Sequence, residues 1–429
     1  MPTAVQQTPS TITTLDNGLR IVVTSLPHSQ AAALALWVGV GSRAEQRKTL
    51  GLSHYLEHML FKGTESRPTA AEISSAIEGA GGTLNAFTTK EATTYWNRVP
   101  FDRLDLAMDV VTDSLRHSLL SEEEIERERT VIQQEIRRSH DEPAQRADQL
   151  LDEAVYGDQP LGWDIAGDLE SVASVHRSHL VDHIAAWYQP ANMVLAIAGN
   201  VDVAAATALA AEAWGEAPNA PLPARAAARD GMAPDRIRVE TREIEQCNLA
   251  FGLRTFPRTD PDRYALTLMN SILGSGMSSR LFLEVRERRG LAYAVGSRLA
   301  RHVDAGHLMI GAGVTQENVL EATDVILTEV KRLACDPVAP EELEKAREHA
   351  VGAYRLSLET ATAHASRTGD DLLHEGRIRS IEEVVSSLRA VSADDILRVA
   401  QRVITPGNLA AVVVGPYEDG EALAAHAAI

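Results

Sequence analysis

Apolar and polar positions follow two different periods along this chain, and each period predicts a different kind of element. Short runs rich in apolar, β-branched or aromatic residues at 19–23, 33–38, 83–88 and 93–99 predict strands. The segment 52–61 carries apolar residues around the whole circumference of a helix and predicts a largely buried one. Because helices and neighbouring strands mix along the chain, the pattern favours an α+β fold.

Capping patterns predict where some of these helices begin and end. Thr69 and Glu72 form a capping box that opens a helix, which we expect to end in the glycine-rich stretch 79–82. Ser121 opens a long helix that runs towards His140. Gly63 is the expected C-cap of the helix at 52–61.

The chain also repeats itself at a register of 216 residues. The segments 190–199 and 406–415 both read Pro-x-Asn, then an apolar run, then Gly. Between the two copies, the segment 215–236 is rich in Pro and Ala and has no sustained apolar period, which is typical of a linker. We therefore expect two homologous domains, 1–217 and 236–429, each with a mostly antiparallel sheet packed with helices.

Composition excludes several classes of protein. The chain has 429 residues, 45% of them hydrophobic, and a formal charge of −19, which opposes binding to nucleic-acid phosphates. It has neither a long apolar run nor the features of a signal peptide at its N-terminus, so we expect no membrane span and no export. The two cysteines, Cys247 and Cys335, suggest neither a disulfide framework nor a thiolate site. A cytoplasmic location is therefore expected.

The segment His54-Tyr55-Leu56-Glu57-His58 carries the chemistry. On a helix, His54 and His58 lie one turn apart on the same face, so both imidazoles can bind one tetrahedral Zn²⁺. Glu57 beside them is suited to take a proton from the attacking water as general base, in the inverted H-x-x-E-H order. The alternative is a solvated helix face, but three titratable groups on a mostly apolar helix are costly unless something pairs them.

A third protein ligand is needed, since catalytic zinc sites usually have three. Glu128 and Glu135 lie nearly two turns apart on the long helix and share a face, so one could bind the ion and the other could orient a ligand. Val131 and Ile132 are expected to pack between the two helices. The alternative is that both carboxylates belong to an exposed, charged helix face.

One rival set of imidazoles, His176, His179 and His183, also has helical spacing. The 216-residue register places Ser, Asp and Val at the matching points of the second copy. We therefore interpret these histidines as an exposed helix face whose residues vary.

The stretch 51–64, together with the two downstream carboxylates, resembles the pitrilysin/insulinase family of inverted-zincin metallopeptidases. The half-length bacterial peptidases and the β subunit of mitochondrial processing peptidase are most similar, and the resemblance covers nearly the whole chain. It implies that Glu135 is the third ligand of one Zn²⁺ per chain. It also implies that Glu128 supports the site without binding the ion.

The same resemblance implies how a substrate is held. A peptide would add as a strand along Asn85, Ala86 and Phe87, with Phe87 lining a pocket beside the scissile bond. Arg286 and Tyr293 would reach the zinc site from the second half, to hold a carbonyl and to stabilise the oxyanion. Without the resemblance, these residues read as an ordinary strand and a solvated helix.

These observations together predict a zinc metalloendopeptidase. The resemblance further implies that Glu57 would activate water against peptide bonds of unfolded peptides or presequences, inside a closed chamber. The resemblance implies a homodimer, with a heterodimer as the alternative. The negative charge and the lack of a long apolar run exclude nucleic acid and membrane as expected partners. Two other functions are open: a non-catalytic core subunit with the same fold, and a peptide-binding chaperone without Glu57-dependent cleavage.

Overall fold

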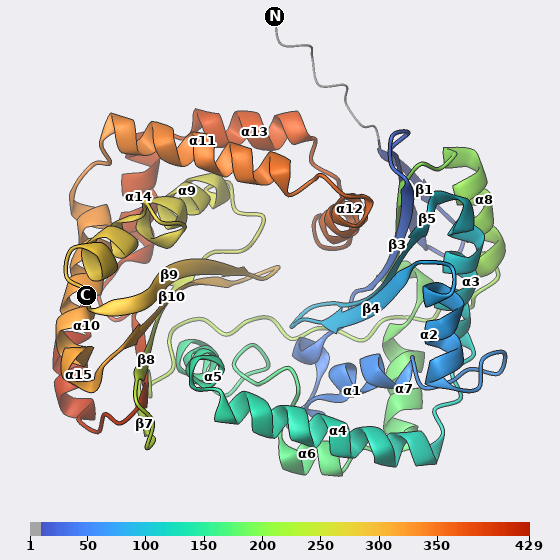
Figure 1. Ribbon diagram of the computed structural model, residues 1–429, viewed down its shortest axis with the longest axis horizontal. Coiled ribbons are helices and arrows are strands. Elements are labelled where there is room, and N and C mark those ends of the chain that lie inside the picture. Colours follow the sequence, from blue (N-terminus) through green and yellow to red (C-terminus); the bar gives the residue numbers. More distant parts are fainter. Residues whose placement is uncertain (1–9) are drawn as a thin grey trace, which may run out of the picture. The chain divides into compact units, whose positions relative to one another are not determined.

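The computed structural model describes residues 10–429, which divide into two compact units (Figure 1). Unit 1 contains residues up to 136 together with 164–226 and 355–381. Unit 2 contains residues 137–163, 227–354 and 382–429. Each unit has one sheet with helices packed on it, so the α+β prediction is confirmed.

The sheet of unit 1 has six strands in the order β1-β2-β6-β3-β5-β4. Within it β2 and β6 are parallel, and the other neighbouring pairs are antiparallel, as expected. The edge strand β4 pairs with β5 on one side and leaves its other backbone edge without a strand among the described residues. The strands are β1 (Ser10–Thr14), β2 (Arg20–Ser25), β3 (Ala31–Val38), β4 (Thr83–Thr88), β5 (Thr93–Pro100) and β6 (Met193–Gly199).

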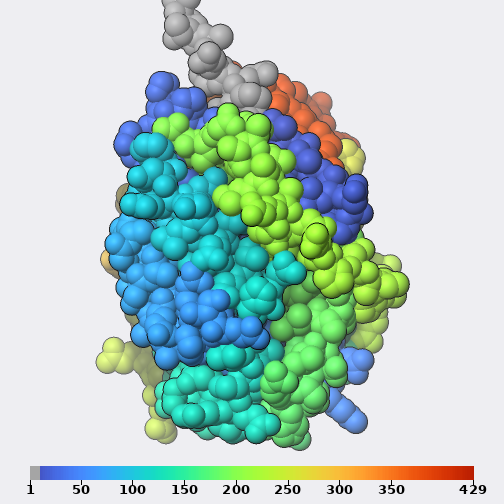
Figure 2. Space-filling view, turned by 90° about the vertical axis from the view of Figure 1, so that its right-hand side faces the viewer, coloured from blue at the N-terminus to red at the C-terminus, as the bar shows by residue number. Residues whose placement is uncertain are grey.

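Alternation along the strands divides this sheet into two apolar faces. On β3, Leu34 and Leu36 face one layer of helices, while Ala35 and Trp37 face the other. Figure 2 shows the solvent side of the first layer, where α2, α3 and α8 lie next to one another. The helices of the first layer are α1 (Leu52–Met59), α2 (Ala70–Glu78), α3 (Leu104–Arg116), α4 (Glu122–Asp141), α6 (Leu169–Ala173), α7 (Arg177–Trp187) and α8 (Val203–Trp214). The second face is covered by α12 (Ala361–Glu375).

Unit 2 repeats this plan with five strands in the order β7-β11-β8-β10-β9. Its parallel pair is β7 with β11, and its other pairs are antiparallel. The strands are β7 (Ile237–Thr241), β8 (Cys247–Thr255), β9 (Ala292–Arg301), β10 (Gly306–Val314) and β11 (Ala410–Gly415). The helices are α5 (Pro143–Tyr156), α9 (Arg263–Gly274), α10 (Val319–Cys335), α11 (Pro340–Leu356), α13 (Ile381–Ala390), α14 (Ala393–Val403) and α15 (Gly420–His426).

The repeated Pro-x-Asn segment has the same structural task in both units. Before β6, the Asn192 amide donates to the carbonyls of Gly39 and Trp187, at 3.1 and 2.9 Å. Before β11, the Asn408 amide donates to the equivalent carbonyls, those of Arg254 and Val403, at 3.0 and 2.6 Å. Each asparagine thus joins a helix end to a neighbouring strand end. Apart from β1, which has no counterpart, the strands follow the same order in both sheets, in agreement with two homologous units.

The compact units differ from the contiguous ranges 1–217 and 236–429 in two helices. The helix α5 comes from the first half of the chain but packs on β8 and β11 of unit 2. The helix α12 comes from the second half but packs on β3 and β6 of unit 1. Each sheet therefore has one face covered by a helix from the other half of the chain.

Small residues explain how α12 fits against its sheet. The sheet face beneath it is rich in alanine, for example Ala33 and Ala196, and α12 presents Ala361, Ala365 and Gly369 to it. A Cβ atom at Gly369 would lie 2.3 Å from the indole ring of Trp37. The helix therefore approaches the sheet closely only because this position has no side chain.

The helix boundaries agree with the capping patterns except at the end of α1. The Thr69 and Glu72 capping box opens α2, and the backbone N–H of Glu124 donates to the Ser121 hydroxyl at the start of α4. The helix α1, however, ends at Met59, and Gly63 lies in the following loop with a φ of +134°. The predicted C-cap at Gly63 is therefore wrong, because that glycine serves the loop and not the helix.

Replacing Gly369 by Ala tests the packing of α12. We expect Gly369→Ala to lower the free energy of unfolding by about 1–3 kcal/mol, because the added methyl group overlaps Trp37. Gly352→Ala in α11 is the matched control, since a Cβ there meets nothing within 4 Å and it should be neutral or stabilising by about 0.5–1 kcal/mol. Urea denaturation of both variants measures the difference; equal effects would contradict the close packing.

Candidate metal centre

The helix α1 carries two of the three predicted metal ligands, His54 and His58, along a partly exposed face. Its other face is buried in the core of unit 1 through Tyr55, Leu56 and Met59. The helix begins directly after Gly51, which has a φ of +82° and whose Cβ would lie 2.3 Å from a backbone oxygen of Ala166. A glycine is required there, and it sets the direction in which α1 enters the core.

A buried carboxylate holds the first turn of α1. The side chain of Glu45 accepts hydrogen bonds from the backbone N–H groups of Gly51 and Ser53, both at 2.7 Å. These donors have no partner within the helix, and the N-terminal end of a helix favours negative charge. Burial nevertheless raises the pKa of Glu45 from its ordinary 4.5 to about 7, although both N–H groups act to lower it.

The helix α4 brings the carboxylates to α1. Its buried side chains include Ile125, Ile132 and Ile136, and the Tyr55 hydroxyl of α1 donates to the carbonyl of Ile125. This packing orients Glu128 and Glu135 towards α1. The expectation that Val131 packs between the two helices is wrong, since Val131 is 37% exposed. It lies on a more outward-facing side of α4 than Ile132 does.

The three predicted zinc ligands converge. His54, His58 and Glu135 each offer one donor atom within 4.8 Å of the others. The Glu135 Oε2 atom lies 3.9 Å from Nε2 of His54 and 3.6 Å from Nε2 of His58. Ligand atoms about 2.0–2.1 Å from a tetrahedral zinc lie roughly 3.3 Å apart, so this set could bind the ion after a small inward movement of the side chains.

The two imidazoles differ in how they are supported. Nδ1 of His58 lies 3.0 Å from Oε2 of Glu128, and Oε1 of Glu128 pairs with the Lys62 ammonium group at 2.6 Å. This arrangement places the His58 proton on Nδ1 and leaves Nε2 free to bind a cation. Nδ1 of His54 is buried without a hydrogen-bond partner among residues 10–429.

Charges at the site favour a bound cation. Burial, helped by His58, lowers the pKa of His54 to about 4, so its ring is neutral at physiological pH. Burial acts to raise the pKa of Glu128, but the hydrogen bonds from His58 and Lys62 outweigh it and lower the pKa overall. Glu128 is therefore an anion that holds His58, in agreement with the supporting role implied by the resemblance.

Glu57 lies on the same face of α1 but outside the converging set. One of its carboxylate oxygens, Oε2, accepts a hydrogen bond from the Thr88 hydroxyl at 2.5 Å. Burial raises the pKa of Glu57, partly against this hydrogen bond. A carboxylate next to three metal donors, and not itself one of them, is placed as a general base should be.

The predicted substrate strand is the edge strand β4. Asn85, Ala86 and Phe87 lie in its middle, and Ala86 faces the core against which α1 packs. The ring of Phe87 contacts Trp37 edge-on at a centroid distance of 5.6 Å, on the other face of the sheet. The exposed backbone edge agrees with strand addition, and the substrate-binding role of these three residues stays a prediction.

Arg286 and Tyr293 both belong to unit 2, where they lie beside one another. The Arg286 guanidinium carbon is 4.8 Å from the centre of the Tyr293 ring and 4.9 Å from that of Phe282. Arg286 lies in a π-helical segment, Phe282–Glu287, and Tyr293 is 80% exposed on the edge strand β9. Their role at the zinc site stays a prediction.

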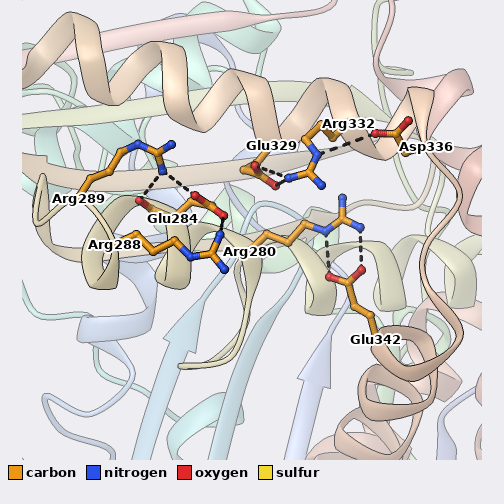
Figure 3. A network of polar contacts seen from close by, with 8 residues as sticks. All are labelled: Arg280, Glu284, Arg288, Arg289, Glu329, Arg332, Asp336 and Glu342. Carbon is orange, nitrogen blue, oxygen red and sulfur yellow. Dashed lines mark hydrogen bonds and ion pairs between the residues drawn. The ribbon is translucent and has the colours of Figure 1, made fainter.

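The segment that carries Arg286 is held by ion pairs on both sides (Figure 3). Glu284 accepts from Arg288 and from Arg289, the latter at 2.6 Å. Before the segment, Arg280 forms a two-pronged pair with Glu342 at 2.9 and 2.7 Å. The neighbouring arginines are thus neutralised, whereas Nε of Arg286 lies 3.8 Å from the Glu287 carboxylate, a looser contact.

The rival histidine set is not a metal site in this structure. The described residues contain one group of three possible ligands with converging atoms, and it does not include His176, His179 or His183. The interpretation as an exposed face is wrong for His183, which is buried beside α1 with Nε2 at 3.4 Å from the Ser53 hydroxyl. Leu180 and His183 both face the core because they lie about one turn apart.

Sequence reasoning missed three supporting residues. Lys62 lies four residues after His58, a helical spacing that carried a weak signal for its pairing with Glu128. Glu45 and Thr88 come from a loop and a strand that are distant from the motif, so no local pattern indicated them. All three reach the site through tertiary contacts.

Two family models match the chain. Residues 20–169 match the model described as insulinase (peptidase family M16), and residues 174–349 match the one described as peptidase M16 inactive domain. His54, Glu57, His58, Glu128 and Glu135 all lie within the first match. The second match begins after them, so its description does not concern the metal centre.

Curated proteins from several bacteria are similar over nearly the whole length. An uncharacterized zinc protease of Streptomyces coelicolor is 37% identical, and the alignment covers 97% of this chain and 92% of that protein. One of Mycobacterium leprae is 36% identical over 96% and 93% of the two chains. An uncharacterized zinc protease of Bacillus subtilis is 32% identical, and the alignment covers 93% of this chain and 97% of that protein.

Solved structures share the fold at low sequence identity. A protease from Helicobacter pylori superimposes with a TM-score of 0.88 at 21% identity, covering 96% of this chain and all of that one. A protein from Pseudomonas fluorescens, described as a peptidase M16 inactive domain, has a TM-score of 0.87 at 19% identity, covering 95% and 98%.

The pKa of Glu45 predicts how stability depends on pH. Because its pKa is higher in the folded than in the unfolded chain, the folded state binds the proton more tightly, and its contribution falls as pH rises from about 4.5 to about 7. In zinc-free urea denaturation, the stability of wild type relative to Glu45→Gln should therefore decrease over that range. Glu65→Gln, at an exposed site, is the control. Parallel curves for wild type and Glu45→Gln would contradict the shift.

Replacement of single carboxylates should distinguish the proposed zinc ligand, Glu135, from Glu128, which supports His58. Glu135→Gln is expected to abolish tight zinc binding, and Glu128→Gln to weaken it by about 10–100-fold, because His58 loses its acceptor. Competition with a chromophoric chelator measures both affinities. Glu122→Gln, exposed at the start of the same helix, should bind zinc like wild type. Unchanged affinity in Glu135→Gln would disprove the ligand set.

Proposed function

Because this chain belongs to the insulinase family of peptidases (family M16), we propose that it is a zinc-dependent metalloendopeptidase acting on unfolded peptides or presequences. One observation carries the proposal: three donor atoms of His54, His58 and Glu135 converge beside a carboxylate that is free to act as a base. The zinc proteases to which the chain is similar support the metal and the reaction class.

Each residue of the centre has a distinct task in this proposal. His54, His58 and Glu135 would hold one zinc ion, which when bound supplies a Lewis acid for the scissile carbonyl and acidifies water. Glu57 takes a proton from the attacking water and returns it to the leaving amine. Glu128 and its partner Lys62 keep the His58 ring in its orientation.

The edge strand β4 supports action on internal peptide bonds. Its backbone edge can pair with a peptide main chain without recognising either terminus, and this requires little of the substrate sequence. An unfolded peptide can adopt the extended conformation that such pairing requires, which agrees with unfolded substrates. Endopeptidase activity and the choice of unfolded peptides are therefore part of the proposal.

Arg286 and Tyr293 are proposed to contact bound peptide. Arg286 is held between two aromatic rings and not by a close carboxylate, so its N–H groups can donate to a carbonyl oxygen. The exposed Tyr293 hydroxyl offers a further donor for a developing oxyanion.

The complete ligand set counts against a non-catalytic core subunit, because such a subunit has no need for a base beside three converging donors. No helix within residues 10–429 is both long and apolar enough to cross a membrane. The cytoplasmic location, the homodimer and the closed chamber stay predictions.

The Glu57→Gln variant tests the proposed reaction. It is expected to lower kcat/KM for an unstructured, internally quenched peptide by about 10²–10⁴-fold, because the amide cannot accept the proton. Its zinc content should match that of wild type, since Glu57 is not among the converging donors. Equal cleavage by wild type and variant would overturn the proposed role of Glu57, whereas peptide binding without any Glu57-dependent cleavage would favour the chaperone function.

Blocking both ends of the same peptide tests for an endopeptidase. Acetylated and amidated peptide should be cleaved at the rate of the free peptide, and mass spectrometry should show internal fragments. Cleavage restricted to free termini would contradict the endopeptidase part of the proposal and leave the zinc peptidase intact.

A further inference from the structure

Thr88 joins the edge strand to the general base. It is the last residue of β4, and the alternation of that strand places Ala86 and Thr88 on the side of α1, while Asn85 and Phe87 face the other way. From this position, the Thr88 hydroxyl donates to Oε2 of Glu57 at 2.5 Å. The strand β4, against which the helix α1 packs, therefore contacts the Glu57 carboxylate directly.

The backbone around Thr88 is tightly held. Thr88 pairs with Thr93 at the end of the β4–β5 ladder. In the turn that follows, the Thr89 N–H donates to the carbonyl of Ala92 at 2.8 Å, and the Ala92 N–H donates to the Thr89 hydroxyl at 3.0 Å. A Cβ on Gly41 would lie 2.1 Å from the Thr89 carbonyl oxygen, so the backbone at Gly41 packs closely against this turn. The hydroxyl donor is therefore placed before any substrate binds.

A hydrogen bond to one oxygen of a carboxylate determines which oxygen stays available to accept a proton. With Oε2 engaged by Thr88, rotation of the Glu57 carboxylate is restricted and Oε1 is the oxygen left to accept a proton from water. Small errors in the placement of a base are costly to catalysis, because proton transfer requires hydrogen-bond distance to the water.

We propose that Thr88 is a positioning residue that fixes the Glu57 carboxylate and joins its orientation to the strand along which the peptide adds. This inference rests on the proposed function. A peptide paired with β4 and the base held by β4 then share one rigid element, so that the scissile bond and Oε1 of Glu57 keep a constant relation.

Two substitutions at this position separate positioning from folding. Thr88→Val keeps the shape and removes the donor, and we expect kcat to fall by about 10–100-fold with KM and zinc affinity within roughly twofold of wild type. Thr88→Ser keeps the donor and should restore kcat to within about threefold of wild type. Thr14→Val, at the exposed end of β1 on the opposite edge of the same sheet, is the matched control and should leave kcat and KM unchanged.

A second measurement does not depend on activity. In the zinc-free protein, the Tm changes of Thr88→Val and Glu57→Ala should be non-additive in the double variant, because either substitution alone removes the same hydrogen bond. Additive Tm changes would show that the two side chains do not interact. Normal kcat in Thr88→Val, or a loss confined to KM or to zinc affinity, would also overturn the inference.

The two proposals fail in different ways. If wild type cleaves no peptide, the metalloendopeptidase proposal fails, whereas the Tm cycle still tests the contact between Thr88 and Glu57. If wild type cleaves and Glu57→Gln does not, the proposed function stands, and the kinetics of Thr88→Val and Thr88→Ser alone decide the positioning role.

Discussion

The structure depends on one constraint: α1 must bury one face in the core of unit 1 while it holds three titratable side chains at the border of that core. Burial of ionisable groups is unfavourable unless partners compensate for the lost water. Here His54, Glu57 and His58 each contact a group from another element: α4 supplies Glu128 and Glu135, and β4 supplies Thr88. The packing of α4 and β4 against α1 is thus inseparable from the arrangement of the site.

The side chains that support the metal centre form a series of contacts that begins at the ligands. His58 is held by Glu128, which is held in turn by Lys62 of the loop after α1. At the other end of α1, Glu45 binds the free N–H groups of the first turn. Because both ends and one side of the helix are fixed, the donor atoms of His54, His58 and Glu135 are held near one another.

The exchange of α5 and α12 between the two halves has a consequence for the metal centre. The sheet on whose far face α12 packs is the same sheet that supports α1, so unit 1 is complete only when residues 355–381 have been added to it. Contacts of such high sequence separation form slowly. The sheet that supports the centre is therefore completed only by contacts between distant parts of the chain.

Local patterns determined a large part of this protein. Local spacing predicted the two histidines one turn apart, the capping box of α2, the Ser121 cap of α4, the paired strands β4 and β5, and the repeated Pro-x-Asn segments, because spacing within one element is written in neighbouring residues. Glu128 and Glu135 could be named as a pair on one face, but their separate roles came from the resemblance and agree with the contacts seen here.

What the tertiary structure decided has a common physical cause. The packing of α12 on the sheet of unit 1, the capping of α1 by Glu45, the burial of His183 and the hydrogen bond from Thr88 to Glu57 all join residues that are distant in the chain. Such contacts depend on which apolar faces fit together, and a one-dimensional pattern does not contain that complementarity. The sequence by itself determined which groups could bind zinc and activate water; only the fold decided what holds them in place.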